Sequence, residues 1–447
     1  MNRNIYFISL GCDKNLVDSE VMLGLLGENG YSFTDSIDDA QIVVVNTCCF
    51  IGDAKEESVN TILEVADYKT NGQVEKIIVT GCLAQRYKDE IINEIPEVDA
   101  VIGTASIEEI VNVIGSAYEG NVASVYKPLD TPPYQAKKRI NSSCQSFGYL
   151  KIAEGCNKHC TYCIIPSLRG PYRSLPIEHL VGEARQLAAT GVTELILVAQ
   201  ETTIYGTDLY GKKSLPELVR ELAKIEDIHW IRILYCYPEE IDDELIELIA
   251  TEPKVVHYLD LPIQHSSDAV LKKMGRLTDE EGLRRVINKL RNRIPDIALR
   301  TTLISGFPGE TEEDFESLYR FVNEIEFDRL GVFPYSLEED TPAASFDNQV
   351  PDEVKLFRRD ELMELQQAIV FDKAETLVGN VYEVMIEGSI PEERVYVGRT
   401  FRDAPDVDGY VFMPYDRERM SGDYCMVRIT GTKEYDLIGE IIDEFAE

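Results

Sequence analysis

Three cysteines on one short loop carry the most specific chemical signal in the sequence. Cys156, Cys160 and Cys163 form a C-x3-C-x2-C pattern. Three thiolates on so tight a loop suit an iron–sulfur cube that leaves one iron without a protein ligand. Zinc is the alternative, but structural zinc usually takes four ligands in paired C-x2-C knuckles, and no second pair follows in the sequence. The spacing therefore predicts an iron–sulfur site with one open iron.

A second set of cysteines is spread along the chain, and each member follows a predicted strand. Cys12 follows the apolar run at 5–8, Cys48 the run at 42–45 and Cys82 the run at 77–79. The carboxyl ends of parallel strands share one rim of a sheet, where open α/β sheets place their ligands. Glycine precedes Cys12 and Cys82, which lets a bulky ligand approach the backbone closely. We predict a second cluster on this rim; the alternative is three small buried core thiols.

The remaining four cysteines have no partner at a useful spacing. We interpret them as core or surface thiols: Cys49, Cys144, Cys236 and Cys425. Cys49 directly follows Cys48, so the spacing leaves open which of the two would bind a metal.

The elements that must position these residues indicate an α/β chain of three domains. Residues 1–125 alternate near-continuous apolar strands with helices, which predicts a doubly wound parallel sheet. Residues 126–146, with several prolines and serines, are typical of a linker. Residues 147–376 repeat the alternation six times, which predicts a partial (β/α)6 barrel with its active site at the strand carboxyl ends. Its expected strands are 149–153, 195–199, 231–235, 258–262, 299–303 and 330–334.

The end of the chain changes pattern. After one long predicted helix at 352–378, short β-type runs are separated by Gly, Pro and Asp. Five such runs over 377–447 predict a small antiparallel β-barrel as the last domain.

The composition limits the compartment and the class of partner. The 447 residues hold 44 Lys and Arg against 80 Asp and Glu, a net charge of −36 that counts against a general nucleic-acid binder. The first eleven residues lack a signal-peptide core, and no window approaches the ~18 apolar residues of a membrane helix. Ten cysteines in so long a chain do not make a secreted disulfide scaffold. We expect a soluble, cytoplasmic protein without a membrane partner.

Nearly the whole chain resembles one known family. The C-x3-C-x2-C loop at the mouth of a partial barrel is similar to the radical S-adenosylmethionine signature. Together with three N-terminal cysteines and a terminal barrel, it resembles the methylthiotransferases, whose last domain is called TRAM. Several strings resemble the branch that modifies a ribosomal protein rather than the branch that modifies tRNA: 9–12 with 14–20, 81–87, 199–203 with 205–206, 260–265 and 402–409. The departures are Asp13, Glu201 and Cys49, where that branch usually has Pro, Asp and Gly.

The resemblance implies a reaction: a methylthio group is added to the β-carbon of one aspartate in the twelfth protein of the small ribosomal subunit. Cys12, Cys48 and Cys82 would hold an auxiliary [4Fe-4S] cluster that carries the sulfur. A second [4Fe-4S] cluster would bind the loop thiols Cys156, Cys160 and Cys163. One S-adenosylmethionine would supply the methyl group, and another a 5′-deoxyadenosyl radical that takes hydrogen from the unactivated carbon. A low-potential electron donor and a sulfur donor are the further implied partners.

Other side chains at strand ends are weaker candidates for contacts with S-adenosylmethionine. Gly306 and Gly309 would let the backbone approach the adenine, or they simply form a strand-to-helix turn. Gln200 and Gln264 would bond the methionine or ribose part, or they are only solvated. Arg300 would pair with the cofactor carboxylate, or with an acid on the barrel rim. Tyr162 would shield the cluster or the adenine, or merely pack.

Three functions from different classes remain: modification of a ribosomal protein, methylthiolation of tRNA, and a non-catalytic iron–sulfur or zinc scaffold. Two distinct cysteine sets weaken the scaffold, which needs no open iron. From Leu377 to Glu447 the net charge is −9, which suits a basic ribosomal protein better than RNA, although acidic faces are usually just solvated. Contact with RNA stays open but is not favoured. Residues 134–175 carry a net +6, which would face the substrate aspartate, the cofactor carboxylate or a redox donor.

Overall fold

The N-terminal domain is a parallel six-stranded sheet. The computed structural model describes residues 3–142 and 146–442, so Cys144 lies outside the described residues. The strands run in the order β2-β1-β3-β4-β5-β6, and every neighbouring pair is parallel. Their bounds are β1 Asn4–Ser9, β2 Ser32–Phe33, β3 Ile42–Thr47, β4 Lys76–Gly81, β5 Ala100–Ile102 and β6 Ala123–Val125.

Helices cover both faces of this sheet, as the apolar runs predict. In β3, Val43 and Val45 pack into one core and Ile42 and Val44 into the other. The helices are α1 Asp13–Glu28, α2 Gly52–Thr70, α3 Cys82–Tyr87, α4 Asp89–Glu94 and α5 Ile110–Tyr118, with 3-10 turns at Ile37–Asp39 and Ile107–Glu109.

Two features of this domain were not predicted. The short strands β2 and β6 have too few residues to show a pattern. The separation of α3 from α4 is the second, because Lys88 between them has φ +46° and ψ −119°, which no α-helix contains.

The central domain is an open parallel sheet of six strands in the order β14-β13-β12-β11-β10-β7. The strands are β7 Phe147–Lys151, β10 Glu194–Val198, β11 Trp230–Ile233, β12 Val255–Asp260, β13 Ala298–Ser305 and β14 Arg329–Pro334. This order confirms the partial barrel, although several bounds move by up to three residues. For example, β11 ends before Tyr235, whose φ of +60° cannot continue a strand.

Helices pack on the outer face of the central sheet, where an extensive apolar core lies. They are α7 Ile177–Ala189, α8 Leu215–Ala223, α9 Asp243–Thr251, α11 Glu280–Arg293, α12 Glu312–Ile325 and α13 Asp352–Leu377. The shorter elements are α6 Ile165–Arg169, α10 Asp268–Lys273, the hairpin β8 Ala153–Glu154 with β9 Arg173–Ser174, and 3-10 turns at Pro238–Glu240 and Pro342–Ser345.

The terminal domain is a closed five-stranded barrel in the order β15-β16-β17-β19-β18. Its strands are β15 Val381–Ile390, β16 Val395–Thr400, β17 Val411–Pro414, β18 Tyr424–Lys433 and β19 Asp436–Ile441. The expectation of a purely antiparallel barrel is wrong in one place, because β17 and β19 pair in parallel. The antiparallel hairpin of β18 and β19 brings β19 back beside β17 in the same direction, and this pairing closes the barrel.

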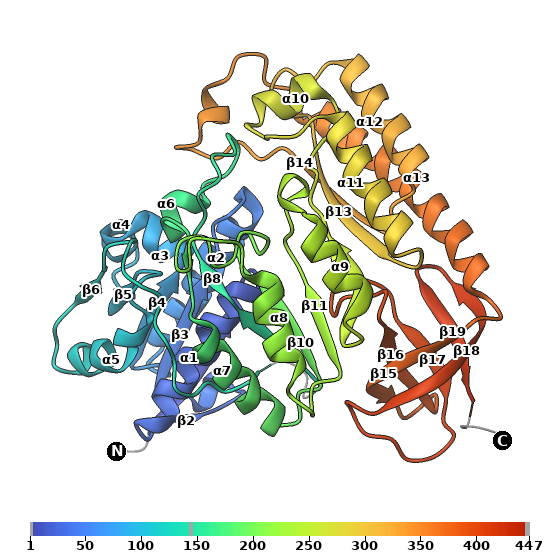
Figure 1. The fold of residues 1–447 in the computed structure, drawn as a ribbon. Coiled ribbons are helices and arrows are strands. Elements are labelled where there is room, and N and C mark those ends of the chain that lie inside the picture. Colours follow the sequence, from blue (N-terminus) through green and yellow to red (C-terminus); the bar gives the residue numbers. More distant parts are fainter. Residues whose placement is uncertain (1–2, 143–145, 443–447) are drawn as a thin grey trace.

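The three domains meet around the inner face of the central sheet. One apolar cluster joins Val17 of α1, Tyr149 of β7, Tyr258 of β12 and Met385 of the terminal barrel. Figure 1 shows the blue N-terminal sheet and the red terminal barrel on opposite sides of the green and yellow central domain. The end of the segment 126–142 packs against α1, where Ile140 N donates to Glu20 O at 3.1 Å. Among the described residues, no helix combines the length and apolar composition needed to span a membrane.

Candidate functional site

Cys12, Cys48 and Cys82 lie on one rim of the N-terminal sheet. They follow β1, β3 and β4, which are neighbours in the sheet. Cys12 is exposed, whereas the other two are buried. Burial raises the pKa of Cys82 to about 11, and the neighbouring charges of Cys48 and Cys12 add to that rise. The structure therefore brings together three thiols that are far apart in the sequence.

Two residues hold the loops of this rim against each other. Gly11 has φ +90°, and a Cβ atom there would lie 2.7 Å from the Cβ of Cys48, so only glycine fits. Asn15 of α1 donates from Nδ2 to Leu10 O at 2.8 Å and to Thr47 O at 2.9 Å. The carbonyls just before the Cys12 and Cys48 loops are thus fixed by one amide.

The structure separates Cys48 from its neighbour Cys49. The Cys48 backbone is held by Ser58, whose Oγ accepts from Cys48 N at 3.0 Å and donates to Cys48 O at 2.7 Å. The Cys48 side chain faces Gly11 on the rim. Cys49 is fully buried in the apolar core beneath, where burial raises its pKa to about 12. Cys48 is therefore the thiol that faces the rim.

The loop with Cys156, Cys160 and Cys163 is anchored at several points. Cys156 N donates to Gly170 O at 3.1 Å. Thr161 donates from N to Met274 O at 2.9 Å and from Oγ1 to the carbonyl before it, Lys273 O, at 2.8 Å. The end of α10 therefore holds the middle of the loop.

Burial disfavours the thiolate form of two thiols of this loop. Burial raises the pKa of Cys156 to about 11 and that of Cys163 to about 12, and the charge of Cys160 adds to both rises. A thiol binds metal as the thiolate, so a strong cation must offset that burial.

In the described part of the chain, no three His, Cys, Asp or Glu side chains are close enough to hold a single metal ion. A cube binds each thiolate through a different iron and so accepts thiols set further apart than those around one zinc.

Two of the predicted cofactor contacts, Gln200 and Gln264, lie at the carboxyl ends of the central strands. Gln200 donates from Nε2 to Glu154 Oε1 at 3.1 Å, and its own Oε1 is buried with no hydrogen-bond partner among the described residues. Gln264 has φ +69° and is bridged to β13 through Thr302 O and Ile304 N. A buried amide oxygen without a partner is what a bound amine or hydroxyl would satisfy.

The other four predicted contacts have partners within the chain. Tyr162 packs edge-on against Phe307, with ring centroids 6.4 Å apart. A Cβ atom at Gly306 would meet Lys355 and one at Gly309 would meet Lys273, so packing within the protein explains both glycines. Arg300 donates from Nη1 to Asp260 Oδ1 at 2.9 Å, deeper along the inner face of the sheet.

A cavity of about 340 Å³ lies between Cys12 and the other two domains. Cys12 and Asp13 line one side, the inner face of the central sheet lines another, and residues 404–407 of the terminal domain close it. The residues from the central domain are Tyr149, Leu234, Tyr235, Tyr258, Asp260 and Arg300. A substrate in this cavity would contact all three domains.

The basic stretch at 134–175 does not form a free cationic patch. Folding pairs its members with acids from other elements: Arg139 with Glu20 and Glu183, Lys151 with Asp18 and Glu154, and Lys158 with Glu240. The expected patch is therefore largely neutralised, because the net charge of a segment does not count the acids that pack on it.

Sequence reasoning missed the residues that approach the two cysteine sets from other elements. Tyr237 places its hydroxyl 3.7 Å from Cys160 Sγ, and Arg276 stacks on the Tyr237 ring at 4.2 Å from its centroid. Arg169, six positions after Cys163, reaches the N-terminal domain. A single Arg in the apolar stretch 164–169 was the only available signal for it.

Three family models match consecutive parts of the chain. Uncharacterized protein family UPF0004 covers residues 4–103, the Radical SAM superfamily 150–322 and the TRAM domain 378–442. Among solved structures, a radical S-adenosylmethionine methyltransferase, TsrM, from Kitasatospora setae has a TM-score of 0.55 at 13% identity, over 86% of this chain and 77% of that chain. This likeness concerns the fold alone.

Relatives with similar sequences span the full length. The ribosomal protein uS12 methylthiotransferase RimO of Lachnoclostridium phytofermentans is 58% identical over 435 residues, which are 97% of this chain and 99% of the relative. A protein with the same description from Acetivibrio thermocellus is 51% identical over 451 residues, covering 99% of both chains.

Proposed function

The chain belongs to the ribosomal protein uS12 methylthiotransferase family, and we propose that it adds a methylthio group to the β-carbon of an aspartate in uS12. It is a radical S-adenosylmethionine methylthiotransferase, since the radical SAM model and relatives that span its full length agree on that class. The observation that carries the proposal is the pair of separate three-thiol sets, one on each side of the interface between the N-terminal and central domains.

The two cysteine sets take different roles in this proposal. Cys12, Cys48 and Cys82 hold an auxiliary [4Fe-4S] cluster, and Cys12 also lines the cavity where the substrate side chain would lie. A second [4Fe-4S] cluster binds the loop thiols Cys156, Cys160 and Cys163. When bound, these groups supply the electron that cleaves S-adenosylmethionine and the sulfur that is transferred.

The chain's own residues bind and orient the cofactor and the acceptor. Gln200 offers a buried acceptor for an amine or hydroxyl of S-adenosylmethionine, and Gln264 follows β12 at the same end of the barrel. Tyr162, inside the cysteine loop, packs edge-on against Phe307 and so joins the loop to an apolar cluster of the central domain. Arg300, neutralised by Asp260, lies on the wall of the cavity rather than free for a cofactor carboxylate.

The partners follow from the chemistry. A low-potential electron donor and a sulfur donor are needed for each cycle, and the substrate is a protein of the small ribosomal subunit. We place the reaction in the cytoplasm, where that substrate is made. The net charge of −9 over Leu377 to Glu447 favours a basic protein over RNA as the partner of the terminal barrel.

Comparing cells that carry the gene with cells that lack it tests this function. We expect mass spectrometry to find one methylthio group on uS12 in the first strain and none in the second. Bulk tRNA from both strains is the control and should have the same nucleoside profile. A change in tRNA with unaltered uS12 would favour the tRNA branch instead. A protein that cleaves no S-adenosylmethionine after reconstitution and reduction would favour the scaffold.

A further inference from the structure

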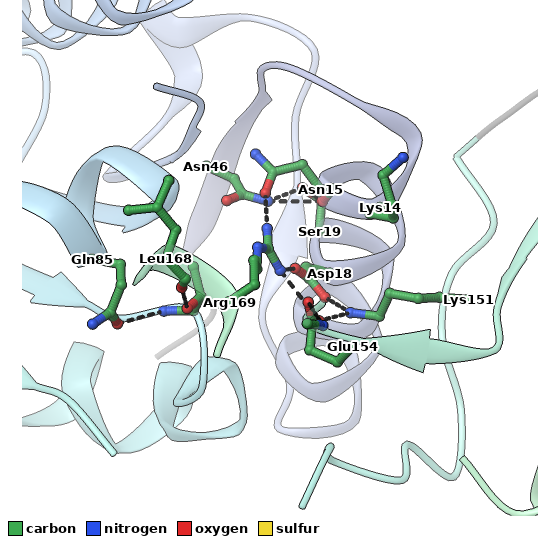
Figure 2. Close-up of polar contacts among 12 residues, drawn as sticks. Lys14, Asn15, Asp18, Ser19, Asn46, Gln85, Lys151, Glu154, Leu168 and Arg169 are labelled. Carbon is green, nitrogen blue, oxygen red and sulfur yellow. Dashed lines mark hydrogen bonds and ion pairs between the residues drawn. The ribbon is translucent and has the colours of Figure 1, made fainter. Parts of the chain in front are cut away.

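One arginine of the central domain is buried between the two cysteine sets. Arg169, the last residue of α6, is only 2% exposed. Its Nη1 donates to Asp18 Oδ2 at 2.6 Å and to Glu154 Oε2 at 3.3 Å, and its Nη2 donates to Asn15 Oδ1 at 2.6 Å. Figure 2 shows the guanidinium entering the N-terminal domain between these side chains. Burying a guanidinium costs desolvation free energy even when all its partners are protein groups. The position of Arg169 therefore needs a physical explanation.

The first reason lies in what Asn15 does with its other atoms. While its Oδ1 accepts from Arg169, its Nδ2 donates to Leu10 O and Thr47 O. Those carbonyls belong to the loops that carry Cys12 and Cys48. Arg169 therefore orients the amide that ties two of the three rim loops together.

The backbone next to Arg169 holds the other cysteine set and the rest of the rim. Gly170 O accepts from Cys156 N at 3.1 Å, and Leu168 O accepts from Thr104 Oγ1 of the N-terminal domain at 2.6 Å. Leu168 also packs in the same apolar core as Cys82. Three consecutive residues thus contact the backbone of the first loop cysteine, the amide that ties the rim loops and the core that contains Cys82.

The charges around Arg169 balance. Asp18 and Glu154 each pair with both Arg169 and Lys151, so two cations face two anions in a site where all four side chains are largely buried. A balanced network of this kind has one low-energy arrangement and resists sliding of the two domains. Lys14, also drawn in Figure 2, is paired with Asp13 instead.

We propose that Arg169 is a positioning residue that fixes the auxiliary cysteine rim relative to the loop of Cys156, Cys160 and Cys163, so that radical formation is coupled to sulfur transfer. The inference rests on the proposed function and deepens it, because it states what sets the geometry between the two sites. It predicts that loss of Arg169 lowers the amount of methylthio-uS12 formed per 5′-deoxyadenosine, while cleavage of S-adenosylmethionine continues.

The test replaces the guanidinium of Arg169 and measures the product of each of the two sites separately. In Arg169→Gln we expect the methylthio-uS12 formed per 5′-deoxyadenosine to fall about tenfold or more, as for other residues that orient metal ligands, while 5′-deoxyadenosine formation stays within about threefold. Arg169→Lys keeps the charge but cannot bond Asn15 and Asp18 together, so its ratio should lie between those of the wild type and Arg169→Gln. The double variant Arg169→Gln with Asp18→Asn restores the charge balance and keeps the test open if Arg169→Gln folds poorly.

A spectroscopic readout separates this role from a general loss of stability. In a background where Cys156, Cys160 and Cys163 are Ala, only the rim cluster remains, and Arg169→Gln should change its electron paramagnetic resonance spectrum. The matched control is Arg358→Gln, another buried arginine, which pairs with Glu310 of the central domain and should leave that spectrum unchanged.

Two results would overturn the proposal: an unchanged rim spectrum in Arg169→Gln, or a coupling ratio equal to that of the wild type. Should the wild-type protein leave uS12 unmodified, the proposed function fails, while the spectral comparison still decides the role of Arg169.

Discussion

Glu194 is the anion that docks the terminal barrel onto the central sheet. It accepts from Arg232 Nε at 2.7 Å and from Arg399 Nη2 at 2.6 Å, and all three side chains are fully buried. Arg399 also donates to Glu387 Oε1 at 2.5 Å, so two cations face two anions. Replacing Glu194 by Gln removes one anion and leaves a buried positive charge uncompensated.

The cost of that change follows from the burial. Removing one partner of a buried ion pair destabilises a protein by about 3–5 kcal/mol, far above the ≤1 kcal/mol of an exposed pair. The single tryptophan reports on this interface, because Trp230 of β11 packs against Tyr424 of the terminal barrel with ring centroids 5.0 Å apart. Urea unfolding followed by tryptophan fluorescence should therefore show Glu194→Gln unfolding at a clearly lower denaturant concentration.

Two further variants sharpen the result. Glu221→Gln, which breaks an exposed pair with Lys224, should cost less than about 1 kcal/mol. Glu194→Leu combined with Arg232→Met removes an anion and a cation together and should recover most of the loss. A Glu194→Gln protein within about 1 kcal/mol of the wild type would refute the reasoning that this buried network holds the barrel in place.

Three other predictions concern single residues. Burial lowers the pKa of His265 to about 3 and keeps it neutral in the folded chain, so stability is lost as the pH falls below the unfolded value of 6.5. Between pH 7 and 5 the wild type should lose about 2 kcal/mol more unfolding free energy than His265→Asn, and equal pH profiles in urea titrations would contradict this. Gly11→Ala places a Cβ atom against Cys48 and should lower the iron bound by the rim in elemental analysis, whereas full iron content would argue against the tight rim. Cys49→Ala should keep the rim iron, while Cys48→Ala should lose it; the reverse result would exchange their roles.

The sequence predicted the parts of this protein that depend on local pattern. The buried runs around Val43 and Ile77 identify parallel strands because both faces of the sheet are covered. Cys156, Cys160 and Cys163 lie on one loop, so their spacing alone places them together. The rim cysteines could be placed because strand ends in a parallel sheet share an edge.

The parts that could not be predicted depend on contacts between domains. Arg169 meets Asn15 across 154 positions of sequence, and no periodicity encodes such a contact. Lysines from α13 and α10 lie against the glycines at 306 and 309, which no local pattern indicates, and contact of these glycines with the cofactor stays a prediction. The net charge of residues 134–175 also predicted a basic patch that folding largely neutralises. Lys151, for example, pairs with acids that lie before and after it in the chain.

The most direct test of the central claim is one incubation of uS12 and S-adenosylmethionine with reconstituted, reduced protein, analysed by mass spectrometry for both methylthio-uS12 and 5′-deoxyadenosine. The wild type should form both products. A variant with Cys12, Cys48 and Cys82 changed to Ala should form 5′-deoxyadenosine but no methylthio-uS12, and one with Cys156, Cys160 and Cys163 changed to Ala should form neither. Transfer of a methylthio group by the variant that lacks the rim thiols would contradict the separate roles proposed for the two cysteine sets.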